Sequence, residues 1–176
     1  MKKIATFALL LTGLVMSSQT HAQTDKDKAK PASPPASVMQ TTTSGTAISI
    51  KYCQPSVRGR TIGKDLEPME GQVWRTGANE ATVFEISKAV KINGKDLPAG
   101  KYGLFSLSGK DNWTIIFNKT WKQWGAFNYK EADDALRIQV PVKKAEPFAE
   151  QMTFTIDKSG VVTLVWGDNK VSFTVQ

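Results

Sequence analysis

Apolar and polar residues alternate over short stretches of this chain, and this period of two constrains its fold more than any other feature. Ile48, Ile50 and Tyr52 alternate with Ser49 and Lys51. Successive side chains of a β-strand point to opposite faces of a sheet, so such a stretch buries one face and exposes the other. Similar strand patterns are found over 82–86, 90–97, 102–107, 113–118, 136–142, 152–156, 161–166 and 171–175.

Helical periodicity never exceeds one or two turns, and the best candidate for a short helical turn is 131–136. About nine short, mostly antiparallel strands with frequent turn signals predict a single all-β domain. We interpret it as a β-sandwich, with a β-barrel as the alternative. Gly167-Asp168-Asn169 predicts a turn between the last two strands. Pro141 has no amide donor, so its strand is expected at a sheet edge or at a bulge.

The first 22 residues have the features of a cleavable secretory signal. Two lysines precede an apolar run from Ile4 to Met16, and Thr20-His21-Ala22 offers a small–x–small cleavage site. A membrane span needs about 20 apolar residues, and the run from Ile4 to Met16 is shorter than that. We therefore expect export to the periplasm or the outside of a bacterial cell, with no membrane span after cleavage. Residues 23–36 contain no large apolar side chain and are expected to form a disordered tether before a domain over 37–176.

Cleavage would also restrict the available chemistry. It would remove His21, the only histidine, and with it any imidazole base, Ser-His-Asp triad or histidine-bound metal. Cys53 is the only cysteine, and we interpret it as a small buried hydrophobe. We expect no metal and no cofactor. The 23 Lys and Arg residues exceed the 16 Asp and Glu residues, but we interpret this excess as a solvated surface and expect no nucleic-acid partner.

Two long segments interrupt the alternation, and such segments in a compact domain are commonly functional. The arginine segment, residues 55–79, contains three of the four arginines, whose planar donor groups suit carboxylate, phosphate or sulfate. The aromatic segment, residues 119–134, offers ring faces that suit stacking on sugars. The predicted ligand-binding residues are Arg58, Arg60, Arg75, Asn79, Asn118, Trp121, Trp124 and Tyr129.

Both segments also have a purely structural interpretation. The arginines could pair with nearby carboxylates and hold their segment against the sheet. These carboxylates are Asp65, Glu67, Glu70 and Glu80. Trp124, Phe127 and Tyr129 could close the open end of the sandwich as core, which makes Trp121 the more exposed candidate. Trp113 and Trp166 lie in expected strands and are expected in the core.

Five motifs along the chain are similar to those of a known family. They are Pro55–Arg60, Val73–Thr82, Leu97–Phe105, Trp113–Asn118 and Trp124–Tyr129. In this order they resemble DUF2911, a bacterial family of unknown function, over about residues 33–176. The resemblance implies an exported all-β domain and brings no established activity. Gln54 departs from the family, whose members often have Ser-Arg before the proline, so any role of an arginine there is absent.

We therefore expect a ligand-binding module of the cell envelope, with an anionic sugar or another carboxylated small molecule or glycan as its ligand. One alternative is a hydrolase that uses Glu80. Glycoside hydrolysis needs a second carboxylate at a defined separation, for which Asp133 or Asp134 is available. Another alternative is a structural or partner-binding protein that uses an exposed sheet edge, such as the strand with Pro141. The oligomeric state stays open.

Overall fold

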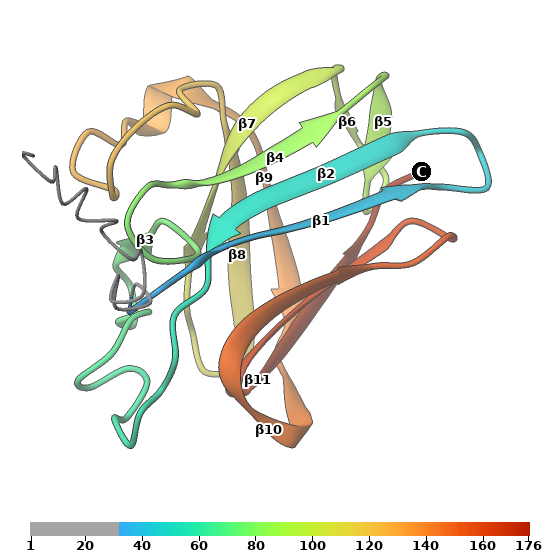
Figure 1. The fold of residues 1–176 in the computed structure, drawn as a ribbon. Helices are drawn as coiled ribbons and strands as arrows, with labels where there is room; N and C mark the ends of the chain where they lie inside the picture. Colours follow the sequence, from blue (N-terminus) through green and yellow to red (C-terminus); the bar gives the residue numbers. More distant parts are fainter. Residues whose placement is uncertain (1–31) are drawn as a thin grey trace, which may run out of the picture.

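The computed structural model of this protein describes residues 32–176. The predicted signal peptide and residues 23–31 of the predicted tether lie outside the described part of the chain. Because β-strand periodicity dominates the sequence from residue 48 onwards, nearly all of the regular structure consists of strands (Figure 1).

The larger of two layers is a seven-stranded sheet. Its strands are β1 (Pro35–Thr41), β2 (Ala47–Cys53), β3 (Val73–Trp74), β4 (Thr82–Ile86), β7 (Gly100–Leu107), β8 (Asn112–Asn118) and β9 (Asp134–Pro141). They are arranged in the order β1-β2-β4-β7-β8-β9, with β3 paired to β7. Each of these pairs is antiparallel.

A long hairpin forms the second layer. It consists of β10 (Lys143–Ile156) and β11 (Val161–Thr174), and it lies across the lower side of the main sheet in Figure 1. A small hairpin of β5 (Val90–Ile92) and β6 (Lys95–Leu97) stands at one end. The predicted all-β sandwich is confirmed, and the sheets do not close into a barrel because β1 and β9 are the two edges of the main sheet.

The core fills the space between the layers. Ile48, Ile50 and Tyr52 are buried in it, as their alternation predicts. Aromatic rings from both layers meet edge to face, with Phe117 in contact with Phe173 of the hairpin at a centroid distance of 5.6 Å. Trp74, Trp113 and Trp166 are fully buried, which confirms the core positions expected for the last two.

The predicted turn at Gly167-Asp168-Asn169 is wrong, because β11 continues through these residues. Gly167 has a φ of 60° and pairs with Ala149 between two register shifts of β10 against β11. Glycine residues with positive φ occur both in β-bulges and in turns. Here it bends a continuous strand instead of reversing the chain.

Three further details concern element boundaries. The strand with Pro141 is an edge strand, as predicted. The expected helical turn near 131–136 is a short 3₁₀ helix, η1 (Glu131–Asp133). β1 begins at Pro35, two residues before the expected start of the domain, and proline suits the first residue of an edge strand. Within residues 32–176, no helix is long and apolar enough to cross a bilayer.

Candidate ligand-binding site

The arginine and aromatic segments meet at one end of the sandwich, on the left in Figure 1. Their contact is made by backbone groups. The Gly125 N–H donates to the Asn79 carbonyl at 3.0 Å, and the Ala81 N–H donates to the Gln123 carbonyl at 3.0 Å. Glu80 and Trp124 face each other across this short antiparallel bridge. The end of the arginine segment therefore holds the aromatic segment in place.

Two adjoining hollows lie on either side of Glu80. One, of about 490 Å³, reaches the β1–β2 side, and the other, of about 310 Å³, reaches the aromatic segment. Both are lined by Glu80, Ala81 and Val83, so together they form one feature, which we call the Glu80 groove. Its other described lining residues are Pro35, Ala36, Ser37, Lys51, Tyr52 and Cys53 on one side and Trp121, Lys122, Gln123 and Trp124 on the other.

The two tryptophans of the groove differ in exposure. Trp124 is 58% exposed, whereas Trp121 is half-buried. The expectation that Trp121 is the more exposed of the two is wrong. Trp121 lies against β7, where a Cβ on Gly103 would come within 3.3 Å of the Trp121 Cα, and the Lys101 Nζ lies 5.4 Å from its ring centroid.

The aromatic segment also covers part of the main sheet. Phe105 and Ile116 form a small apolar cluster apart from the main core, and Tyr129 packs against it. The Phe105 and Tyr129 ring centroids are 5.1 Å apart. Phe127 is 83% exposed. Of the three aromatic residues that could close the sandwich, Tyr129 packs on the sheet, while Trp124 and Phe127 face solvent.

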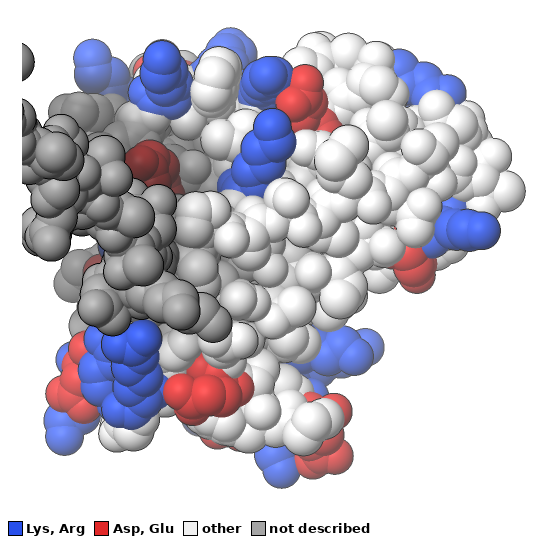
Figure 2. Space-filling view, in the orientation of Figure 1, with Lys and Arg blue, Asp and Glu red and all other residues white. Residues whose placement is uncertain are grey.

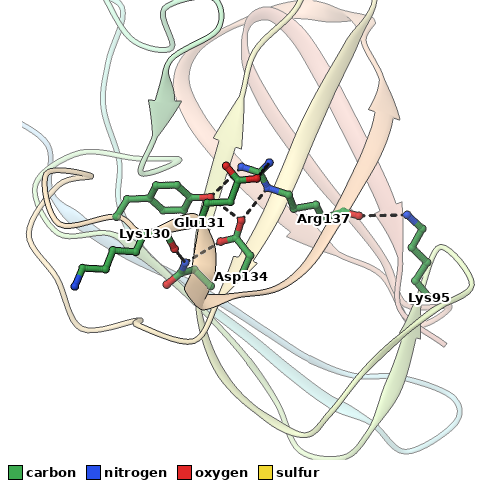
Figure 3. A network of polar contacts seen from close by, with 7 residues as sticks. Lys95, Lys130, Glu131, Asp134 and Arg137 are labelled. Atoms are coloured by element: carbon green, nitrogen blue, oxygen red, sulfur yellow. Dashed lines mark hydrogen bonds and ion pairs between the residues drawn. The ribbon is translucent and has the colours of Figure 1, made fainter.

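A polar network holds the base of the aromatic segment (Figure 3). The Tyr129 hydroxyl donates to Asp134 Oδ2 at 2.6 Å and accepts from Arg137 Nη2 at 3.0 Å. Arg137 also pairs with Glu131, at 2.9 Å. Burial, and then the hydrogen bond to Asp134, raise the pKa of Tyr129 to about 12. The Tyr129 hydroxyl is thus occupied within the protein.

Asn118 belongs to the same network. It is fully buried, and its Nδ2 donates to Asp134 Oδ1 at 2.8 Å and to the Lys130 carbonyl at 3.0 Å. Its Oδ1 accepts from the Thr120 N–H at 2.9 Å. Asn118 and Tyr129, both predicted as ligand-binding residues, therefore brace the aromatic segment and do not line the Glu80 groove.

The three predicted arginines are placed in different surroundings. Arg58 is exposed, and its backbone N–H donates to Glu150 Oε1 at 2.8 Å. Arg60 donates to the carbonyls of Val57 and Ser56, at 3.0 and 2.7 Å. Among the described residues no ion pair joins these arginines to the four carboxylates considered above.

Arg60, Arg75 and Asn79 line a separate hollow of about 240 Å³, which we call the arginine hollow. Trp74 and Trp166 also line it. The predicted ligand-binding residues that line a hollow are thus divided between two sites. Asn79 lines the arginine hollow and Glu80 lines the Glu80 groove, and the backbone turns between the two sites at Asn79, which has a φ of 58°.

Glu80 is exposed, and its Oε2 accepts a hydrogen bond from the Cys53 thiol, with Sγ 3.7 Å away. Cys53 is half-buried, in contrast to the expected buried hydrophobe. Glu80 is the only carboxylate among the described lining residues of its groove. Asp133 accepts from Thr120 and Asp134 belongs to the Tyr129 network, and neither of these two carboxylates lines the Glu80 groove.

Sequence reasoning missed Lys51 and Lys122, which line the groove on its two sides. Alternation places Lys51 on the outer face of its strand, but no local signal shows which loop that face meets. The described residues contain no group of three or more His, Cys, Asp or Glu that could hold a metal ion.

The family model described as protein of unknown function (DUF2911) matches residues 33–175, nearly all of the described chain. No curated protein and no solved structure matches significantly.

Proposed function

The chain belongs to the DUF2911 family, and because that family has no assigned activity, we propose from the geometry that the Glu80 groove binds an acidic glycan. This proposal keeps the ligand class expected from the sequence and changes the residues that contact it. Export, as the first 22 residues predict, would bring the groove into a compartment that contains such glycans.

The observation that carries the proposal is the exposed Trp124. It lines the groove with 58% of its surface open to solvent. Tryptophan is highly buried on average in folded proteins, so an exposed one beside a groove is free to contact a ligand, and its flat ring suits the apolar face of a pyranose. The backbone bridge to Glu80 holds the Trp124 main chain beside the groove, which lowers the backbone entropy lost on binding.

Charge and size are consistent with an acidic saccharide. Lys51 and Lys122 lie on opposite sides of Glu80, and both are exposed. Their ammonium groups can attract a sugar carboxylate, while Glu80 can accept a hydrogen bond from a sugar hydroxyl. On the face shown in Figure 2, basic side chains lie scattered over a mostly neutral surface, with a few acidic side chains near them. Hollows of about 490 and 310 Å³ are within the usual range for small-ligand sites.

The test is a tryptophan-fluorescence titration with acidic glycans and their neutral counterparts. We expect the acidic member of a pair to bind more tightly, and Trp124→Ala to weaken binding by about 1 kcal/mol, roughly fivefold. Phe127→Ala is the matched control, because Phe127 is an exposed aromatic residue of the same segment that does not line the groove.

Equal affinity for acidic and neutral glycans would contradict a role of the lysine charges in binding. Equal losses of affinity in Trp124→Ala and Phe127→Ala would contradict binding in the Glu80 groove. If no glycan binds to the folded protein, the proposed function is wrong and a partner-binding role at a sheet edge becomes the better hypothesis.

A further inference from the structure

The arginine hollow contains a donor that the fold leaves unused. The Nε of Arg75 is buried and has no hydrogen-bond partner, and no described residue accepts a hydrogen bond from its guanidinium group. Buried donors are nearly always paired in folded proteins, so an unpaired one requires an explanation. A guanidinium that lines a hollow can be paired by an anion bound there.

The indole and carboxylate groups that line the hollow already have partners. Trp74 Nε1 donates to the Gly77 carbonyl at 3.0 Å, and Trp166 Nε1 donates to the Glu67 carbonyl at 2.8 Å. The Glu67 carboxylate accepts from the Met69 N–H at 2.9 Å. Among the guanidinium, indole and carboxylate groups that line the hollow, Arg75 is therefore the one without a described partner.

Arg60 adds a second positive charge. Its Nε and Nη2 are held by two backbone carbonyls, at 3.0 and 2.7 Å. Carbonyl groups orient the guanidinium but do not neutralise its charge. Arg60 and Arg75 thus give the hollow two cationic groups against the single carboxylate of Glu67.

The turn that carries Arg75 is rigidly held. The Thr82 N–H donates to the Arg75 carbonyl at 3.1 Å, and the Thr82 hydroxyl donates to the Thr76 carbonyl at 2.7 Å. Thr76 has a φ of 52°, and its hydroxyl lies 3.0 Å from that of Ser106. Non-glycine residues adopt such a conformation only where the surroundings hold it, and it occurs often at ligand sites.

From these observations we propose that the arginine hollow is a binding site for a small oxyanion, such as a carboxylate, phosphate or sulfate group, with Arg75 as its main donor. Its volume of about 240 Å³ suits such a group and is below the usual size for a larger ligand. The site is distinct from the Glu80 groove and does not depend on the glycan proposal.

The experiment follows the arginine Nε–H signals of the ¹⁵N-labelled full chain by NMR. The protein has only four arginines, so the signals can be assigned with single Arg→Lys variants. Acetate, inorganic phosphate and sulfate are titrated separately, with chloride at matched ionic strength as the reference. We expect the Arg75 signal to shift and saturate with at least one oxyanion, which also identifies the preferred class.

Arg75→Lys keeps the charge but removes the planar donor group, and it should weaken binding about tenfold or more. Arg58→Lys is the matched control, since Arg58 lies outside the hollow, and it should leave affinity unchanged. An Arg75 signal that does not move, or that moves equally with chloride, overturns the proposal. Because this readout uses the unmodified protein, it decides the question even if Arg75→Lys does not fold.

Discussion

Tyr129 shows how tertiary contacts change the chemistry of a single side chain. Its ring covers Phe105, and its hydroxyl lies between Asp134 and Arg137. Desolvation, the larger cause, and the neighbouring Asp134 carboxylate both oppose ionisation, and together they raise the pKa of Tyr129 to about 12. Since the pKa in the folded protein exceeds the ordinary value of 10.0, the folded state holds this proton more tightly than the unfolded chain does.

The contribution of Tyr129 to stability should therefore be complete below pH 10 and should be lost as the pH rises towards 12. We expect the tyrosinate absorbance of the folded protein to include a step near pH 12 that is missing in Tyr129→Phe. Tyr102→Phe is the control and should keep that step. A Tyr129 midpoint close to 10 would contradict the network in Figure 3.

Among the elements, the aromatic segment depends on close contact with β7. A Cβ at Gly103 would lie 2.8 Å from Phe105 Cε2 and 3.3 Å from the Trp121 Cα and the Thr120 carbonyl oxygen. Two of these three atoms belong to the backbone of the segment, so a side chain here cannot be accommodated by a rotamer change. Gly103 thus lets the segment approach the sheet and sets the position of the tryptophans beside the Glu80 groove.

Gly103→Ala should displace the aromatic segment from the sheet and destabilise the protein by about 1–3 kcal/mol, the usual cost of overpacking. The free energy of unfolding from a urea titration measures this effect, and the fluorescence maximum of the folded variant should move as Trp121 becomes more hydrated. Ser37→Ala, at an exposed position of β1, is expected to leave both quantities nearly unchanged. Unaltered stability in Gly103→Ala would mean that the segment is not held by this contact.

For the whole molecule, stability comes from the apolar interior between the main sheet and the β10–β11 hairpin. Trp166 of β11 is fully buried, and its Nε1–H donates to the Glu67 carbonyl at 2.8 Å. One side chain therefore links the second layer to the arginine segment. This link helps to hold a long irregular segment in place in a chain whose single cysteine allows no intrachain disulfide.

Trp166→Ala should lower the free energy of unfolding by about 3–5 kcal/mol, because it leaves a large cavity and an unpaired carbonyl. Trp124→Ala deletes the same side chain from an exposed position and should change it by less than about 0.5 kcal/mol. Chemical denaturation of both variants provides the comparison. Similar losses in the two would contradict the burial difference on which the core assignment and the groove both depend.

The all-β class, the buried faces of the strands and the core positions of Trp113 and Trp166 could be predicted from the sequence alone. These properties follow from the alternation of apolar and polar residues, a pattern that is visible within a few neighbouring positions of the sequence. The division of the predicted binding residues between two hollows, the exposure of Trp124 and the presence of Lys51 in the groove were decided by the tertiary structure. They depend on which distant segments meet and which polar groups they satisfy, and no local pattern contains that information.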